Sequence, residues 1–261
     1  MAARAIWKGN LKLDSIKVPV KLYAAVSDKS VRFHILEDRN KIRVRQHMVD
    51  RESGAEVPNE DIRKGFEIEP GTFVILEEAE LKSLQPEPSR EIEIKEFVPK
   101  EAITPEYYDR PYYLEPDGDQ ASYFALAKAL RNQEKEGIAH WIMRNQEYTG
   151  ALGVWDDYLV LFTLRKAEEV LSARDLPKPE ARAPEKKELN MARQLVELLH
   201  GEFNAGDYRD EYSDRVMEFI KQKAKGKAPR LQPVRTKRAP ASLEKVLAKS
   251  VAALKKEKRA A

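Results

Sequence analysis

Short apolar segments, separated by Pro and Gly, fill the chain from residue 5 to about residue 170. Their alternating or continuous apolar positions predict strands at 18–26, 31–36, 42–49, 73–76, 91–98, 138–144 and 158–164. Apolar residues at helical spacing predict helices at 120–133 and 77–84, packed onto the sheet. So many short strands favour a β-barrel or a β-sandwich.

The pattern changes after residue 175. Residues 176–184 contain three prolines, which can neither continue a helix nor complete a ladder, so this segment is predicted to be a linker. Two amphipathic stretches follow, on either side of residues 204–206, and predict two packed helices. From Ser242 onward apolar positions again share one helical face opposite lysines, and this end could fold on a partner or remain a solvated tail.

Charge is distributed unevenly along the chain. Residues 221–261 contain fourteen Lys/Arg and two acidic residues, a net charge of +12, and since the whole chain carries +3, the first 220 residues carry −9. A basic tail on an otherwise acidic chain is typical of proteins that bind nucleic acid, although a disordered tail without a ligand has the same composition.

A second basic pattern lies between residues 41 and 45. In a strand, Lys41, Arg43 and Arg45 would project from one face at a spacing of roughly 7 Å, comparable with the spacing of phosphates along DNA. Further cations lie nearby in sequence. A strand with one solvent-exposed face would show the same alternation of residues. Together with the basic tail, however, the pattern favours contact with a DNA duplex.

The sequence also bounds the compartment and the chemistry. Cysteine is absent, which excludes disulfides and thiolate zinc sites, and no segment reaches about 18 consecutive apolar residues, so we expect a soluble cytoplasmic protein without a membrane partner. The four histidines are scattered, and neither a phosphate-binding loop nor a dinucleotide fingerprint occurs. We therefore expect no catalytic residue, no metal and no cofactor.

One motif keeps an enzymatic alternative open. Glu93-x-Lys95 resembles half of the signature of Mg²⁺-dependent nucleases, although strand alternation with Ile92 and Ile94 inward explains it equally simply. The aromatic residues Trp7, Phe33, Phe66, Trp141 and Trp155 could in principle stack on unpaired bases. Because aromatics in strand-like segments are usually core residues, they are not assigned to stacking.

Several stretches together resemble bacterial Ku, the DNA-end-binding protein of non-homologous end joining, in register over about residues 4–228. They are Ile6-Trp-Lys-Gly9, Val18-Pro-Val-Lys-Leu-Tyr23, Phe33-His34, Gly54-Ala-Glu-Val57, Arg63-Lys-Gly-Phe-Glu67, Glu96-Phe-Val98, Tyr112-Tyr-Leu-Glu-Pro-Asp117, Gly137-Ile-Ala139, Met143-Arg144 and Glu188-Leu-Asn-Met-Ala192. The chain departs from the family at Leu13-Asp-Ser-Ile16 and at Gly150-Ala-Leu-Gly-Val-Trp155, where only local strand and loop detail is affected.

The resemblance implies an α+β fold with a Ku-type β-barrel core. The expected division is a barrel with a DNA-encircling bridge at 1–175, a Pro-rich linker at 176–186, a ligase-recruiting helical region at 187–227 and a basic tail at 228–261. It also implies a non-enzymatic homodimeric ring that binds double-stranded DNA ends, protects and bridges them, and recruits an ATP-dependent DNA ligase near the nucleoid. A Mg²⁺-dependent nuclease and a general nucleoid-binding or RNA-binding protein remain the alternatives.

Residues are assigned to these roles by position. The predicted DNA contacts are Lys29, Arg32, Arg39, Lys41, Arg43, Arg45, Arg51, Lys64, Lys223, Lys225, Lys227, Arg230, Arg235, Lys237 and Arg238. The predicted ligase-docking residues are Leu195, Leu199, Tyr208, Tyr212 and Phe219.

Overall fold

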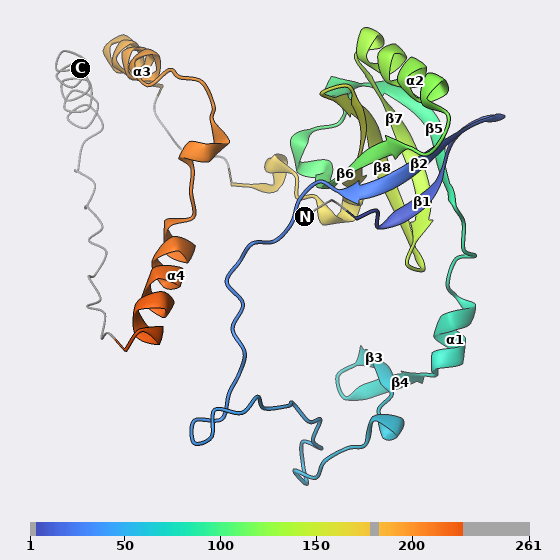
Figure 1. Cartoon of the computed structure of the whole chain (residues 1–261), viewed down its shortest axis with the longest axis vertical. Helices are drawn as coiled ribbons and strands as arrows, with labels where there is room; N and C mark the ends of the chain where they lie inside the picture. The colour runs from blue at the N-terminus through green and yellow to red at the C-terminus, as the bar shows by residue number, and fades with distance from the viewer. Residues whose placement is uncertain (1–3, 178–182, 227–261) are drawn as a thin grey trace. The chain divides into compact units, whose positions relative to one another are not determined.

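Seven strands close into a barrel in the computed structural model, which describes residues 4–177 and 183–226 (Figure 1). Around the barrel the order is β1-β2-β6-β9-β8-β7-β5. The strands are β1 (Trp7–Leu13), β2 (Ile16–Ala24), β5 (Glu91–Pro99), β6 (Tyr108–Pro116), β7 (Lys135–Met143), β8 (Gln146–Trp155) and β9 (Tyr158–Leu164). All neighbours run antiparallel except β1 and β5, which are parallel and close the barrel. The barrel expected from the sequence is confirmed.

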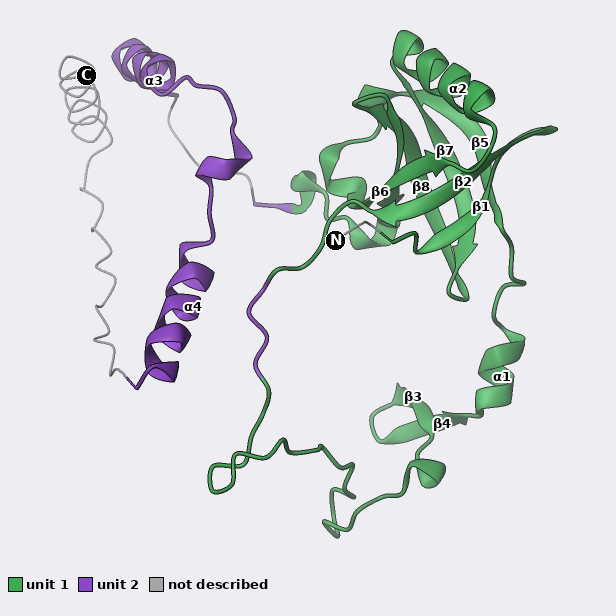
Figure 2. Ribbon diagram, in the orientation of Figure 1, with its two compact units in different colours: residues 1–29, 34–175 green, residues 30–33, 176–261 purple. Residues whose placement is uncertain are grey.

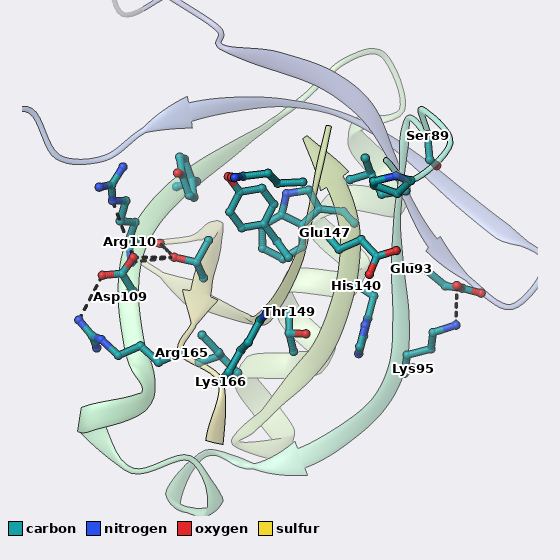
Figure 3. Close-up of a pocket in the computed structure, with 18 of the residues that line it drawn as sticks. Ser89, Glu93, Lys95, Asp109, Arg110, His140, Glu147, Thr149, Arg165 and Lys166 are labelled. Atoms are coloured by element: carbon teal, nitrogen blue, oxygen red, sulfur yellow. Dashed lines mark hydrogen bonds and ion pairs between the residues drawn. The ribbon is translucent and has the colours of Figure 1, made fainter. Parts of the chain in front are cut away.

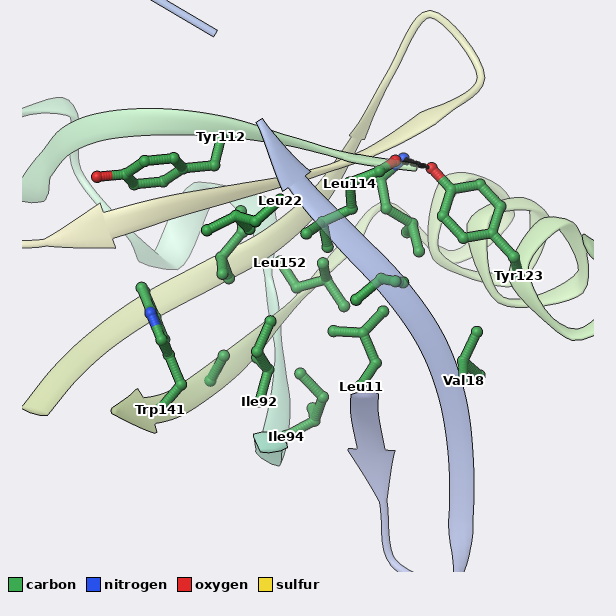
Figure 4. Packing of buried hydrophobic residues seen from close by; sticks show 14 of the residues in the cluster. Leu11, Val18, Leu22, Ile92, Ile94, Tyr112, Leu114, Tyr123, Trp141 and Leu152 are labelled. Carbon is green, nitrogen blue, oxygen red and sulfur yellow. Dashed lines mark hydrogen bonds between the residues drawn. The ribbon is translucent and has the colours of Figure 1, made fainter. Parts of the chain in front are cut away.

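The barrel core follows from strand alternation, because successive side chains point to opposite faces. Leu11, Leu22, Ile92, Leu114 and Leu152 are completely buried and face inward (Figure 4). Helix α2 (Gln120–Gln133) packs on this core through Tyr123, Ala127 and Leu130, which are also buried. Its N-cap Asp119 accepts a hydrogen bond from the backbone N–H of Ser122 at 3.0 Å. The helix therefore begins at the cap and is held by three inward side chains.

Tyr123 fixes α2 to two strands at once. Its hydroxyl donates to the carbonyl of Leu114 in β6 at 2.5 Å and accepts from the backbone N–H of Leu159 in β9 at 2.8 Å (Figure 4). Burial raises the pKa of this phenol to about 12. Both backbone groups lie in the core, where an unpaired polar group is costly.

Two glycines allow close backbone approach in the barrel wall. A Cβ at Gly150 would lie 2.3 Å from the carbonyl oxygen of Phe162, and a Cβ at Gly9 would lie 2.3 Å from that of Arg90. The contact between Gly9 and Arg90 lies where the chain returns to the barrel at the start of β5. There the backbone N–H of Asn10 donates to the same Arg90 carbonyl at 2.8 Å. Larger residues at either position would push the strands apart.

A long excursion separates β2 from β5. It contains the short helical turn η1 (Asn59–Asp61), the two-stranded sheet of β3 (Lys64–Glu69) and β4 (Thr72–Leu76), and helix α1 (Glu78–Ser83) (Figure 1). We call residues 25–90 the arm. No residue between 34 and 90 is buried, so this stretch has no core of its own.

Further short helical turns connect the elements: η2 (Lys100–Ala102) and η3 (Pro105–Tyr107) between β5 and β6, then η4 (Ala167–Glu169) and η5 (Ala173–Asp175) after β9. Helices α3 (Lys186–Leu198) and α4 (Glu211–Ala224) follow, with η6 (Ala205–Asp207) between them. Neither helix contains a buried residue, so the packing of one on the other expected from the sequence is not seen.

The chain divides into two units, Met1–Lys29 with His34–Asp175, and Ser30–Phe33 with Leu176–Ala261 (Figure 2). No helix in the described part of the chain combines the length and apolar composition needed to cross a membrane.

Candidate nucleic-acid interface

The predicted strands at 31–36 and 42–49 are wrong. This part of the arm forms two small hairpins with one bridge each, Leu36 with Arg43 and Val49 with Glu56. Lys41 has a left-handed backbone, with φ of 56°, and closes the first turn, where its amine pairs with the Asp38 carboxylate. Lys41 therefore does not lie in a row with Arg43 and Arg45. The sequence does alternate between apolar and basic residues at 41–45. A continuous strand, however, needs a neighbouring strand for its backbone hydrogen bonds, and here only the two isolated bridges form.

The second hairpin is held by its turn. The Asp50 carboxylate accepts from the backbone N–H groups of Glu52 at 3.0 Å and Ser53 at 2.7 Å, and hydrogen bonds with Ser53 hold its pKa below the usual range. Gly54 follows with φ of 69°, a conformation that favours glycine. Arg51 stands in this turn, just as Arg39 stands in the first. The arm thus presents cations at two hairpin tips and, through Arg43 and Arg45, between them.

The arm cations differ from the barrel lysines in their pairing. All the predicted arm cations are exposed, and within residues 4–177 and 183–226 no ion pair is found for Arg39, Arg43, Arg45 or Arg51. Lys64 lies in β3 near Glu78 and helps to lower the pKa of that carboxyl after the larger effect of Lys82. The arginines at the hairpins are therefore available to an external anion.

The barrel lysines are neutralised in place. Lys12 and Lys17 pair with Glu91 at 3.2 and 2.5 Å, and Lys21 pairs with Asp117 at 2.9 Å, a carboxylate that also lies 3.5 Å from Lys8. A polyanion that approached this wall would have to displace an existing partner. The barrel wall around β1, β2 and β5 is consequently a poorer phosphate-binding surface than the arm.

A cleft on the barrel contains the residues of the nuclease alternative (Figure 3). Glu93 and Lys95 both line it, but they pair with each other at 2.5 Å, and this contact with Lys95 lowers the pKa of Glu93. Asp109 in the same cleft pairs with Arg165 at 3.1 Å and with Arg110 at 3.7 Å. In the described ranges, no group of three or more His, Asp or Glu side chains is placed to hold a metal ion. The charged side chains of this cleft are therefore arranged as ion pairs on the protein surface.

The C-terminal cations and apolar residues are partly described. Lys223 is in the last turn of α4 and Lys225 caps it, where positive charge stabilises a helix end. The remaining tail cations lie outside the described residues: Lys227, Arg230, Arg235, Lys237 and Arg238. Of the predicted docking residues, Leu199, Tyr208 and Tyr212 are more than 60% exposed, while Leu195 in α3 and Phe219 in α4 are half-buried.

The sequence missed one feature of the barrel surface. Trp141 is 3% exposed, as expected of a core aromatic, and stacks on Tyr148 with ring centroids 5.4 Å apart. Trp155, in contrast, is 57% exposed at the end of β8. The signal that could have found it is its position beside Asp156-Asp157, a turn pair with left-handed backbone that places Trp155 at a strand end.

Comparison with known proteins gives a consistent result. The family model described as "Ku70/Ku80 beta-barrel domain" matches residues 12–191. The non-homologous end joining protein Ku 2 of Geotalea uraniireducens is 39% identical over 87% of this chain and 88% of its own length. The protein Ku of Coxiella burnetii is 35% identical over 86% and 84%, and that of Mycolicibacterium smegmatis 35% over 85% and 72%. These relatives are named as non-homologous end joining proteins. On its barrel, its family match and the extent of these similarities, the chain belongs to the Ku family.

Proposed function

We propose that this protein binds the ends of double-stranded DNA, independently of sequence, in non-homologous end joining. Relatives that share a third or more of its residues carry that pathway in their names. The observation that carries the proposal is a group of exposed arginines without an ion pair in the described part of the chain, on an arm whose two ends are anchored in the barrel strands β2 and β5: Arg39, Arg43, Arg45 and Arg51. Arginines that contact phosphates give affinity without reading base sequence.

We infer further that the active form is a homodimer. Between residues 34 and 90 no residue is buried, although Ile42, Met48, Phe66, Phe73 and Ile75 are each about 60% exposed or more. Complete burial of such a side chain contributes about 1.5–3 kcal/mol, and an isolated two-stranded sheet such as β3-β4 is marginal in water. A second copy, related by a twofold axis, supplies the same surface in return and could complete a ring with the arms.

The predicted DNA contacts follow from this arrangement. Lys29, Arg32, Arg39, Lys41, Arg43, Arg45, Arg51 and Lys64 are exposed on the arm, with Lys41 already paired to Asp38. The basic tail at 228–261 adds sequence-independent affinity to a clamp that the arm and barrel define. Along the sequence, Lys223 and Lys225 at the end of α4 extend that basic stretch toward the N-terminus.

We propose the helical region at 187–227 as the docking surface for an ATP-dependent DNA ligase. Phe203 and Tyr208 stack with centroids 5.5 Å apart, and both are at least 74% exposed. Exposed aromatic and aliphatic residues of this kind are the usual anchors of a protein interface. The same proposal includes domain boundaries at residues 175 and 186, the bridging of two DNA ends and a location at the nucleoid.

The test compares topologies of one DNA. The full chain is titrated with a linear duplex and with the same duplex closed into a circle, in the presence of Mg²⁺, and the DNA is then analysed for length. We expect preference for the linear form without shortening. Equal affinity for circles would instead support a general nucleoid-binding protein, and shortened DNA would restore the nuclease alternative.

A further inference from the structure

One outer face of the barrel gathers exposed aromatic rings. In β6 and β9 the core residues include Leu114, Leu159 and Leu161, so their neighbours Tyr113, Tyr158 and Val160 point to the outer face, where Val160 is covered and the two tyrosines are exposed. Tyr113 is 47% and Tyr158 50% exposed, and Trp155 in β8 pairs directly with Tyr158. Tyr113 lies opposite Val160, which shares a face with Tyr158 two positions earlier. We call Trp155, Tyr158 and Tyr113 the aromatic face.

One ring of this face, that of Trp155, contacts a further aromatic residue. Phe162, farther along β9, is half-buried and lies 6.2 Å from Trp155 and 5.2 Å from Tyr108 between ring centroids. Tyr108 in turn donates a hydrogen bond of 2.6 Å to the buried carboxylate of Glu136, and burial, followed by this bond, raises the pKa of the phenol. The Trp155 ring is therefore supported by Phe162, which lowers the entropy cost of holding it for a ligand.

The charges beside the aromatic face suit a nucleic-acid strand. The Lys100 amine lies 5.7 Å from the centroid of Trp155, close enough to meet a phosphate next to a base on that ring. Arg131 of α2 pairs with Asp157 in the adjoining turn, and Lys21 and the Tyr23 hydroxyl contact Glu115 beside Tyr113, so these two carboxylates have cationic or donor partners. Neighbouring strands stand about 4.8 Å apart, which lets successive rings meet successive bases.

We propose that the aromatic face binds the unpaired bases of single-stranded DNA by stacking, with Lys100 contacting the phosphate backbone. Stacking tolerates any base, because every base has a π face, and it needs exposed rings near a cation and no base-specific hydrogen bonds. The ligand is the single-stranded extension of a broken duplex. This activity goes beyond the binding of duplex ends and depends on neither the arm arginines nor the dimer.

The main experiment measures the affinity of the full chain for two duplexes that differ only in an extension of ten unpaired deoxyadenosines. The wild type is expected to prefer the extended duplex. Trp155→Ala with Tyr158→Ala should lower affinity for the extended duplex about tenfold or more, while blunt-end affinity changes little. Trp155→Phe with Tyr158→Phe keeps the rings and should keep the preference. A preference that is absent in the wild type, unchanged in the alanine variant or lost in the phenylalanine variant overturns the proposal.

A spectroscopic readout guards against a variant that fails to fold. Trp155 is the most exposed of the three tryptophans, since Trp141 is buried and Trp7 half-buried. Addition of a deoxyadenosine decamer should quench tryptophan fluorescence in the wild type and much less in Trp155→Phe. No quenching in the wild type, or equal quenching in both, contradicts stacking on this face. If the wild type does not prefer linear over circular duplex, that result counts against the proposed binding of duplex ends. It does not change the interpretation of the quenching experiment.

Discussion

Lys17 of β2 and Glu91 of β5 form an ion pair of 2.5 Å across β1, the strand between them in the barrel wall. Lys12 of β1 reaches the same carboxylate at 3.2 Å and also lies 3.8 Å from Glu93. The one parallel seam of the barrel is therefore bordered by lysines of β1 and β2 on one side and by carboxylates of β5 on the other. These lysines hold strands together, and their chemistry leads to the first prediction.

Acid should weaken the barrel through Glu91. Hydrogen bonds from Lys17 and then Lys12 lower the pKa of Glu91, so its stabilising contribution is complete above the unfolded pKa of about 4.3 and is lost as pH falls through the lower folded value. Denaturant unfolding between pH 6 and pH 3 should show less acid sensitivity in Glu91→Gln than in the wild type. Glu87→Gln, at an exposed position, is the control and should leave the pH profile unchanged.

Tyr123→Phe should destabilise the protein by about 1–3 kcal/mol. The change deletes one hydroxyl and leaves the carbonyl of Leu114 and the N–H of Leu159 unpaired in the core. Thermal and urea unfolding measure the effect. Tyr113→Phe removes a hydroxyl from a half-exposed ring and should cost much less, and equal losses in the two variants would contradict the bridging role.

Arg43→Gln with Arg45→Gln should reduce affinity for a short duplex and lower the salt slope by about 2, because two phosphate contacts are lost. The matched variant Lys12→Gln with Lys17→Gln removes the same charge from paired positions on the barrel. It should leave the slope nearly unchanged. Equal slopes in both variants would show that net charge, and not the arm, governs binding.

Phe66→Ser with Ile75→Ser should shift the protein toward monomers. Both side chains are more than 60% exposed on the β3-β4 sheet, so their replacement should change the folding stability of one chain little. If a second copy buries them, the replacement removes apolar area from the dimer interface and weakens association. Sedimentation equilibrium measures the change, which we expect to be at least tenfold in the dissociation constant. Ile16→Ser removes a similarly exposed residue (60%) from the start of β2 in the barrel and should have no effect.

Deletion of residues 228–261 should weaken duplex binding and its salt slope while sparing the preference for linear over circular DNA. The reason is electrostatic, since the tail adds cations and the arm defines the geometry. Competition binding with both DNA forms gives the two quantities. A deletion variant that no longer distinguishes ends from circles would assign end recognition to the tail.

Local patterns predicted much of the barrel. Helix 120–133 and strand 158–164 were predicted with the bounds that are observed, because Tyr123, Ala127 and Leu130 repeat at helical spacing and the strand is a continuous apolar run. Strands β6 and β8 were not among the predictions. Prolines at 111 and 116 and glycines at 150 and 153 interrupt their patterns, and only pairing with neighbours distant in sequence makes them strands.

The functional surface was less predictable for the same reason. Arg43 and Arg45 were identified by residue type, but their backbone depends on which segment pairs with them, and the strand assumed for them does not form. Trp155 was assigned to the core because aromatic residues in strands usually are. Which side of a closed barrel a residue faces depends on register around the whole ring of strands, which no single segment encodes.

The attachment of the arm has an evolutionary consequence. Its two ends are set by β2 and β5, whose positions on either side of β1 are fixed by the barrel. The entropy cost of closing a loop grows slowly with its length, by only about 0.6 kcal/mol for each doubling. Insertions or deletions in residues 25–90 can therefore accumulate without disturbing the barrel, and a lineage can change the length of the arm at little cost in folding stability.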